Sequence, residues 1–195
     1  MKFYIHLLFF LLFSFWGSAQ KKIQINFALQ DEASLKTYLS SKKTDFSDAD
    51  LYILKDFKSF AYFNNNDKLQ VPEILFFNNQ GYLVKNRFNN NECTEVISDI
   101  EKVNRYKSDK KVTLQDWLQF ISPLKNPQPG IDHNKITVVI NWAIFTDQYN
   151  EQSFEWYKKI RALSLSTKIN CILLNLDVQQ KWNLTEKQKA ALHIE

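Results

Sequence analysis

Residues 23–103 alternate between short apolar runs and amphipathic stretches, and this order limits the folds open to the chain. Apolar residues in continuous or alternating runs predict strands, and apolar residues spaced three and four apart predict helices. Strands are expected at 23–27, 51–54, 71–77 and 82–85, and helices at 31–39, 57–63 and 92–103. The first strand–helix–strand unit should be parallel. The last two strands should form a hairpin around Gly81, so the order predicts an α/β fold.

The same kinds of pattern resume after a polar stretch at 104–111, which we interpret as a linker. The rest of the chain predicts a short helix at 114–121, an irregular segment at 123–129, a buried strand at 136–141, a helix at 151–163, a strand at 169–176 and a last helix at 186–192. Thr185 is expected to cap that last helix. We therefore divide the chain into units at 20–107 and 108–195.

The first nineteen residues predict a secretory signal peptide. Lys2 precedes an apolar run over 3–16, and Gly17-Ser18-Ala19 places small residues before a cleavage at Gln20. The alternative is that these residues remain as an uncleaved membrane anchor. If they are cleaved, no stable membrane insertion is expected. Without residues 1–19 the formal charge falls from +4 to +3, and the remaining charges of both signs are interspersed, which disfavours nucleic acid as a partner. We expect a periplasmic or otherwise extracytoplasmic protein.

Residues 138–149 read VVINWAIFTDQY, so that Trp142-Ala143 follows an apolar strand. This segment resembles the thioredoxin-like superfamily, in particular its extracytoplasmic thiol-disulfide proteins, in which Trp-Ala and two further residues precede Cys-x-x-Cys. Thr146 and Tyr149 occupy the positions of the two cysteines. The redox motif is therefore lost, and these are vestigial positions.

The first half resembles the same superfamily through its spacing. Asp56 follows a strand, and Val71-Pro72 leads into the strand before the Asn-Asn-Gln-Gly turn. The resemblance implies a cis Val71-Pro72 bond and a binding edge for an extended peptide beside it; a trans proline at the start of a strand is the alternative. It also implies a three-layer thioredoxin-like fold, with one complete unit followed by a truncated second unit.

Thiol–disulfide exchange requires an attacking and a resolving sulfur at one site, and neither half offers such a pair. The hydroxyl of Thr146 is not ionised at neutral pH, so we expect Thr146 to serve as the N-cap of the following helix. No residue is expected to be catalytic. Cys93 and Cys171 are the candidate thiols; they are free and buried, or joined as a disulfide, or one of them is reactive.

The other chemistries that we considered find no support in the sequence. His133 and His193 are far apart and lie in polar contexts, so no metal site is expected; no glycine-rich phosphate loop is present, and no cofactor is expected. The favoured hypothesis is a redox-inactive module that binds or scaffolds an unknown protein in the bacterial envelope. The alternatives are an atypical single-cysteine thiol-disulfide oxidoreductase and a purely structural remnant.

The strand at 137–141 raises a question of pairing. In the superfamily the Trp-Ala strand is central, with a hairpin on one side, but no hairpin pattern follows residue 176. An open apolar edge promotes aggregation, and each buried unpaired backbone group costs roughly 1–3 kcal/mol. We therefore expect the edge to be covered, either by the sheet of the first unit or by the same strand of a second copy in a homodimer.

Overall fold

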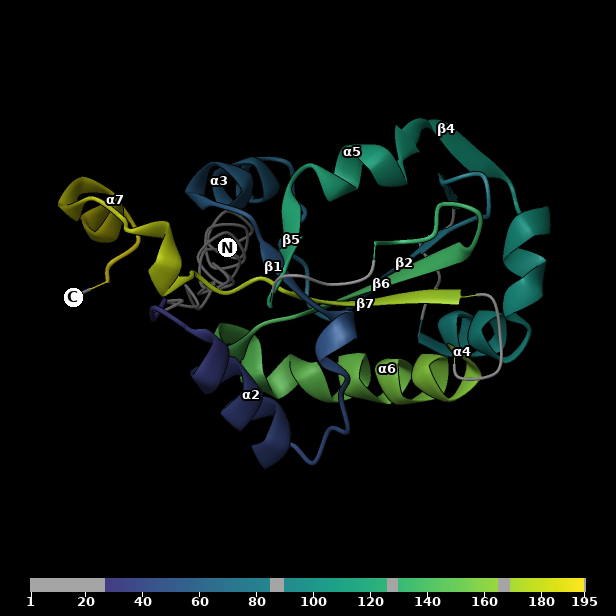
Figure 1. The fold of residues 1–195 in the computed structure, drawn as a ribbon, viewed down its shortest axis with the longest axis horizontal. Helices are drawn as coiled ribbons and strands as arrows, with labels where there is room; N and C mark the ends of the chain where they lie inside the picture. The colour runs from purple at the N-terminus through teal and green to yellow at the C-terminus, as the bar shows by residue number, and fades with distance from the viewer. Residues whose placement is uncertain (1–26, 85–89, 126–129, 165–168, 195) are drawn as a thin grey trace, which may run out of the picture.

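The computed structural model describes residues 27–84, 90–125, 130–164 and 169–194. A mixed sheet runs through the middle of the molecule and helices cover both of its faces (Figure 1), so the fold is α/β. The predicted signal peptide and all but one residue of the predicted strand at 23–27 lie outside the described residues. Within those ranges no helix combines the length and the hydrophobicity needed to cross a membrane.

The sheet takes strands from both halves of the chain. They are β1 (Leu51–Leu54), β2 (Glu73–Phe77), β3 (Tyr82–Val84), β4 (Ser108–Thr113), β5 (Ile121–Pro123), β6 (Ile136–Trp142) and β7 (Ile169–Asn175). Their spatial order is β4-β3-β2-β6-β7-β1-β5. Strand β7 lies parallel to β6 on one side and to β1 on the other. Every other pairing of these strands is antiparallel. The sheet therefore does not divide at residue 107.

Strand β6 is paired along both edges. On one side it lies parallel to β7, and on the other it lies antiparallel to β2, with Glu73 opposite Asn141 and Phe77 opposite Thr137. The prediction that the sheet of the first half covers residues 137–141 is confirmed.

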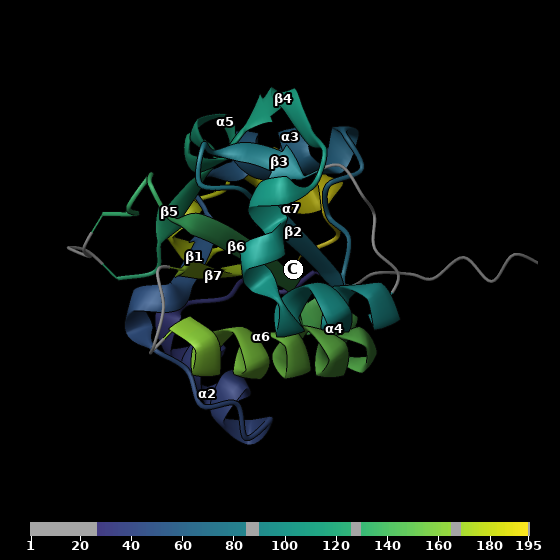
Figure 2. The ribbon, with the colours of Figure 1, turned by 90° about the vertical axis from the view of Figure 1, so that its right-hand side faces the viewer.

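The helices form two outer layers (Figure 2). One layer holds α2 (Glu32–Ser41), α4 (Asn90–Ser98) and α6 (Asn150–Ser164), and the other holds α3 (Phe57–Asn65) and α5 (Leu114–Leu118), with α7 (Glu186–Ala191) at one end of the molecule. Asp31 caps α2 and Thr185 caps α7, both in capping boxes. These two predicted helix starts are confirmed.

Several predicted elements differ from the structure, among them the helix predicted at 92–103, which ends as α4 at Ser98 and is followed by a 3-10 helix. Residues 104–111 are not a linker: the 3-10 helix η2 (Ile100–Arg105) is followed by β4, which pairs with β3. Lys110 and Lys111 are exposed at this edge of the sheet, and charged residues protect an edge strand from association while hiding its apolar pattern. The helix predicted at 114–121 ends at Leu118, because Ile121 begins β5.

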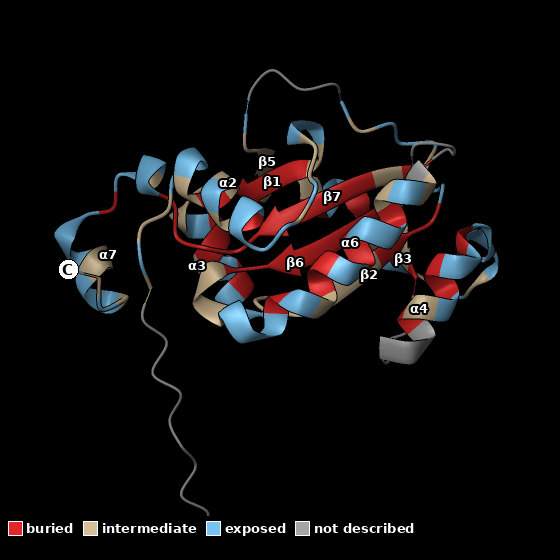
Figure 3. Ribbon diagram, turned by 90° about the horizontal axis from the view of Figure 1, so that it is seen from below, coloured by how far each residue is buried: buried red, intermediate tan, exposed pale blue. Residues whose placement is uncertain are grey.

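The core has two parts, one on each face of the sheet. Val138 and Ile140 of β6 face the layer of α6, and Val139 between them faces the layer of α3. All seven residues of β6 are buried, as the red strands of Figure 3 show. Coverage on both faces explains why its sequence is a continuous apolar run. Trp117, Trp142 and Trp156 are buried in this core, and Trp182 is half-buried.

Candidate functional site

The chain leaves β6 through a loop that is closed by one side chain. Asn150, at the first position of α6 and 1% exposed, accepts a hydrogen bond from the backbone N–H of Ala143 (3.1 Å) and donates one to the Ala143 carbonyl (2.7 Å). The 3-10 helix η3 (Ile144–Tyr149) lies between Ala143 and Asn150. Asn150 thus fixes both ends of the segment that contains Thr146 and Tyr149.

A buried carboxylate, that of Asp177, also holds this segment in place. Asp177 follows β7, is 2% exposed, and accepts hydrogen bonds from the backbone N–H groups of Ile144 (2.8 Å) and Phe145 (3.3 Å) and from the Asn175 side chain (2.6 Å). Burial raises the pKa of Asp177 to about 6, although these three donors favour the ionised form. Sequence analysis missed this residue, because its only signal is an acid after an apolar strand.

Helix α2 holds the outer side of the segment. The Tyr38 hydroxyl donates to Asp147 (2.6 Å) and accepts from Asn150 (2.6 Å), and the Lys42 ammonium lies 2.6 Å from the same Asp147 carboxylate. Lys42 and Tyr38 together hold the pKa of Asp147 below its usual value. The Tyr38 ring also stacks on Trp142 at 5.7 Å. The loop is therefore anchored to β6, β7 and α2.

Thr146 and Tyr149 have different surroundings. Thr146 lies at a kink inside η3 (φ −117°, ψ 36°), and its hydroxyl donates to the Ala143 carbonyl (3.1 Å). The prediction that Thr146 is the N-cap of the following helix is wrong, because the chain forms η3 before α6 starts at Asn150. Tyr149 is 46% exposed, and it is one of two large hydrophobic side chains with such exposure among the described residues.

Pro72 lies close to Tyr149. The Val71-Pro72 peptide bond is cis, as the resemblance implied, and not trans. Pro72 and Tyr149 line one shallow hollow of about 330 Å³ together with Gln148, Gln152 and two glutamates of α6. Within the described residues, no backbone hydrogen bond engages Val71, because the pairing of β2 with β6 begins at Glu73. The N–H and C=O groups of Val71, next to Pro72, thus have no backbone partner among the described residues.

Asn141 carries a further unpaired group near this hollow. Its side-chain nitrogen donates to Glu73 (3.0 Å) on the neighbouring strand and to the carbonyl of Gln70 (3.4 Å). Its side-chain oxygen is buried and has no partner among the described residues. A buried acceptor without a donor costs roughly 1–3 kcal/mol.

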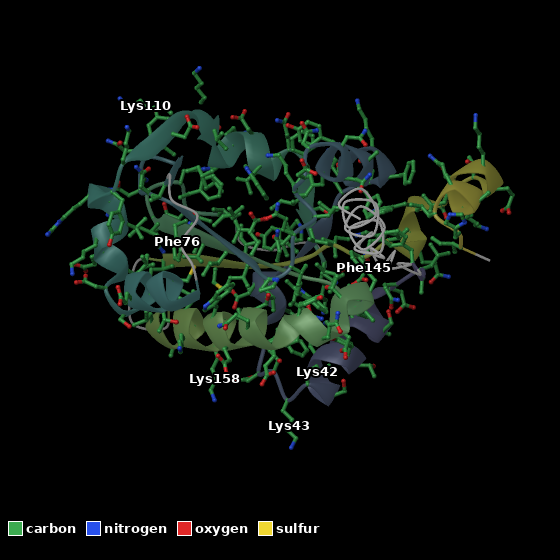
Figure 4. The ribbon with its side chains drawn as sticks, turned by 180° about the vertical axis from the view of Figure 1, so that it is seen from behind. Lys42, Lys43, Phe76, Lys110, Phe145 and Lys158 are labelled. Atoms are coloured by element: carbon green, nitrogen blue, oxygen red, sulfur yellow. The ribbon has the colours of Figure 1, made fainter. Side chains whose placement is uncertain are left out.

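A larger groove of about 780 Å³ lies on the other side of the first turns of α6. It shares Gln148, Glu151 and Glu155 with the hollow at Pro72, and its far wall carries Lys42 and Lys43. Figure 4 shows Lys42, Lys43 and Lys158 on one side of the molecule, where α2 and α6 lie. Charges of both signs line the groove, so it has no preference for one sign of ligand.

The two thiols lie elsewhere. Cys93 on α4 and Cys171 on β7 are both buried within the core and are not joined in a disulfide. Burial raises the pKa of the Cys171 thiol well above its usual value, which disfavours the thiolate that would attack a disulfide. The structure thus brings Pro72 and Tyr149 together and leaves both cysteines away from them.

Among the described residues, the buried acid and the threonine hydroxyl of this segment are both occupied by local hydrogen bonds. Asp177 is sealed under η3, and Thr146 has no base among its hydrogen-bond partners. No group of three His, Cys, Asp or Glu side chains in the described ranges could hold a metal ion. The hollow beside Pro72 carries an exposed aromatic ring, that of Tyr149.

Comparison of the chain with models of protein families, with curated proteins and with solved structures finds no match.

Proposed function

We propose that this chain is an exported, redox-inactive thioredoxin-like protein that binds an extended segment of another protein in the bacterial envelope. The binding surface is formed by Val71, Pro72, Gln148, Tyr149 and Gln152, and we name it the Pro72 surface. The leader at residues 1–19 supports export to the periplasm. A homodimer is not required to complete the sheet, because β2 already covers β6.

The arrangement of strands supports the thioredoxin-like part of the proposal. The strand that ends in Trp142-Ala143 is central, and the hairpin of β2 and β3 lies on one side of it. In the superfamily this hairpin follows the Trp-Ala strand along the chain. Here it precedes that strand, so we infer a single thioredoxin-like unit whose segments are joined in a different order.

The observation that carries the binding function is the unpaired backbone of Val71 next to Pro72, which lines one hollow together with the exposed ring of Tyr149. An extended peptide satisfies such N–H and C=O groups by adding a short strand, and neighbouring side chains provide selectivity. The ring of Tyr149 supplies apolar area, and Gln148 and Gln152 supply hydrogen-bonding groups at the margin. None of these interactions requires sulfur.

The single-cysteine oxidoreductase is the weaker candidate. Both thiols are buried, Cys93 at 2% exposure and Cys171 at 7%. A redox-active cysteine is normally accessible and has a lowered pKa, whereas that of Cys171 is raised.

Site-specific photocrosslinking tests the proposal. We expect p-benzoylphenylalanine in place of Tyr149 to give a discrete adduct in intact cells, and mass spectrometry to locate the attachment in an extended segment of the partner. A synthetic peptide of that segment should bind the purified protein, and Gln152→Arg, which fills the hollow, should abolish binding. The matched control is the same photoreactive residue in place of Tyr62, which is 38% exposed on the other face.

Three results would contradict the proposal. One is an adduct that also forms from position 62, and another is a partner peptide that binds the Gln152→Arg variant equally well. The third is reduction of insulin disulfides by the wild-type protein that disappears in Cys93→Ser, because this would assign the protein to the single-cysteine class.

A further inference from the structure

A separate hollow of about 260 Å³ lies on the face of the sheet that carries α3 and α5. It is lined by side chains of α3, of the loop that follows α3, and of the segment from β4 to β5. None of its lining residues belongs to the Pro72 surface or to the groove along α6. What it binds is therefore independent of the function proposed above.

One wall of this hollow is aromatic and flat. The rings of Tyr62 and Phe120 stack with their centroids 4.3 Å apart and their planes 5° from parallel. Phe63 meets Trp117 edge-on behind them, with centroids 5.1 Å apart. Tyr62 is 38% exposed, so that the stacked pair is open to solvent on one side. Such a wall favours contact with a planar ring.

Two lysines line the hollow, and the carboxylates of Glu73 and Asp116 lie close enough to favour the charged form of Lys68. The ammonium of Lys68 lies 4.8 Å from the centre of the Trp117 ring, half-buried, and Lys111 lines the same hollow. Neither lysine forms an ion pair within the part of the chain that the structure describes. Burial lowers the pKa of the Lys68 amino group, which reflects the cost of removing its charge from water.

The one carboxylate that lines this hollow, that of Asp116, acts on Lys68 through its charge but directs its hydrogen bonds elsewhere. It accepts hydrogen bonds from the hydroxyl (2.7 Å) and the backbone N–H (3.2 Å) of Thr113 in the capping box of α5. The contact of Lys68 with Trp117 offsets part of its desolvation. An external anion between Lys68 and Lys111 would offset more of it, through charge-assisted hydrogen bonds.

We propose that this hollow binds a small planar aromatic carboxylate. The ring lies against the stacked pair of Tyr62 and Phe120, and the carboxylate lies between the ammonium groups of Lys68 and Lys111. The volume of about 260 Å³ is slightly below the usual range for ligand pockets, which limits the ligand to about one ring.

Titration of the full-length mature protein with benzoate tests this proposal, with the indole N–H resonance of Trp117 as the probe. We expect a saturable shift. Benzamide, which has the ring without the charge, and cyclohexanecarboxylate, which has the charge without a planar ring, should each bind several-fold more weakly. Lys68→Met should weaken benzoate binding about tenfold, since it removes a charge-assisted hydrogen bond. Lys68→Arg should retain most of the affinity.

Lys110→Met is the matched control, because Lys110 lies on the same strand as Lys111, is exposed, and projects away from the molecule (Figure 4). It should leave benzoate binding unchanged. If Lys68→Met does not fold, Lys111→Met provides the same test. The proposal is overturned if benzoate produces no saturable shift, if benzamide binds as tightly, or if Lys110→Met weakens binding as much as Lys68→Met.

Discussion

Asp177 shows how a single buried group can hold a loop and oppose folding at the same time. Its carboxylate binds the backbone N–H groups of Ile144 and Phe145, and it is nevertheless buried deeply enough for its pKa to rise from 3.8 to about 6. A raised carboxyl pKa means that the folded protein prefers the protonated form. Asp177 therefore contributes most to stability below pH 4, and this contribution is lost as the pH rises through 6.

The prediction at this scale concerns the pH dependence of stability. The free energy of unfolding of the wild type, minus that of Asp177→Asn, should fall by roughly 2–3 kcal/mol between pH 4 and pH 8. Urea titrations at several pH values measure it. Asp147→Asn is the control, since the pKa of Asp147 is lowered, so its contribution to stability should not fall as the pH rises. A difference for Asp177→Asn that stays constant or grows with pH would show that the three donors outweigh burial.

The sequence predicts single residues well where they act locally. The caps at Asp31 and Thr185 and the positive φ of Gly81 follow from the residue type and its near neighbours. The loop at residues 144–149 is held by Tyr38 and Asp177, which are far from it in the sequence, and by Asn150, which bonds back across it. No local sequence pattern indicates such contacts. For the same reason the sequence does not show that Thr146 bonds to Ala143 before α6 begins.

At the scale of elements, η3 is the least predictable part of the site. The sequence indicates that residues 144–149 lie between a strand and a helix, but their 3-10 conformation depends on Asn150 and Asp177. In a 3-10 helix, side chains three residues apart lie on the same side, and those two apart do not. Thr146 and Tyr149 have that spacing, as the two cysteines of a Cys-x-x-Cys motif do.

Replacing Thr146 and Tyr149 with cysteines should therefore create a pair that forms an intramolecular disulfide and is reduced again by dithiothreitol. Thiol titration and the intact mass of the monomer measure this. The control pair, Thr146→Cys with Gln148→Cys, has the wrong spacing and should remain reduced under the same conditions. Equal oxidation of both pairs, or of neither, would show that the alignment of residues 144–149 with the redox motif is incorrect.

Most strands and long helices are predictable from this sequence, because continuous apolar runs and amphipathic spacing are strong signals. The strands at 51–54 and 136–141 and the helix at 151–163 are confirmed within one residue. The missed strand β4 is polar and carries exposed lysines, so its sequence resembles that of a loop. Its identity depends on pairing with β3, which only the tertiary structure provides.

At the scale of the whole molecule, the central position of β6 is the main result. The need to cover residues 137–141 is predictable, because an open apolar edge is unfavourable. The sequence leaves two candidates for the strand that covers this edge, one from the sheet of the first half and one from a second copy of the chain. The choice of β2 over a second copy of the chain is set by the packing of the whole sheet.

Hydrogen exchange tests this position of β6 in solution. The amides of Val138, Val139 and Ile140 should be among the slowest to exchange, since they are buried and lie between two paired strands. Amides of β4, at the edge of the sheet, should exchange faster and serve as the internal control. Exchange in β6 as fast as in β4, at a low protein concentration that excludes association, would contradict the arrangement.

The pairing of early strands with late ones also determines when this protein can fold during its synthesis. Leu51 on β1 lies opposite Leu173 on β7, and Glu73 on β2 lies opposite Asn141 on β6. When synthesis has reached residue 130, the residues of β1 and β2 have been made, but those of β6 and β7 have not. Such distant contacts slow folding, so the chain remains incompletely folded until the residues of β7 have been made.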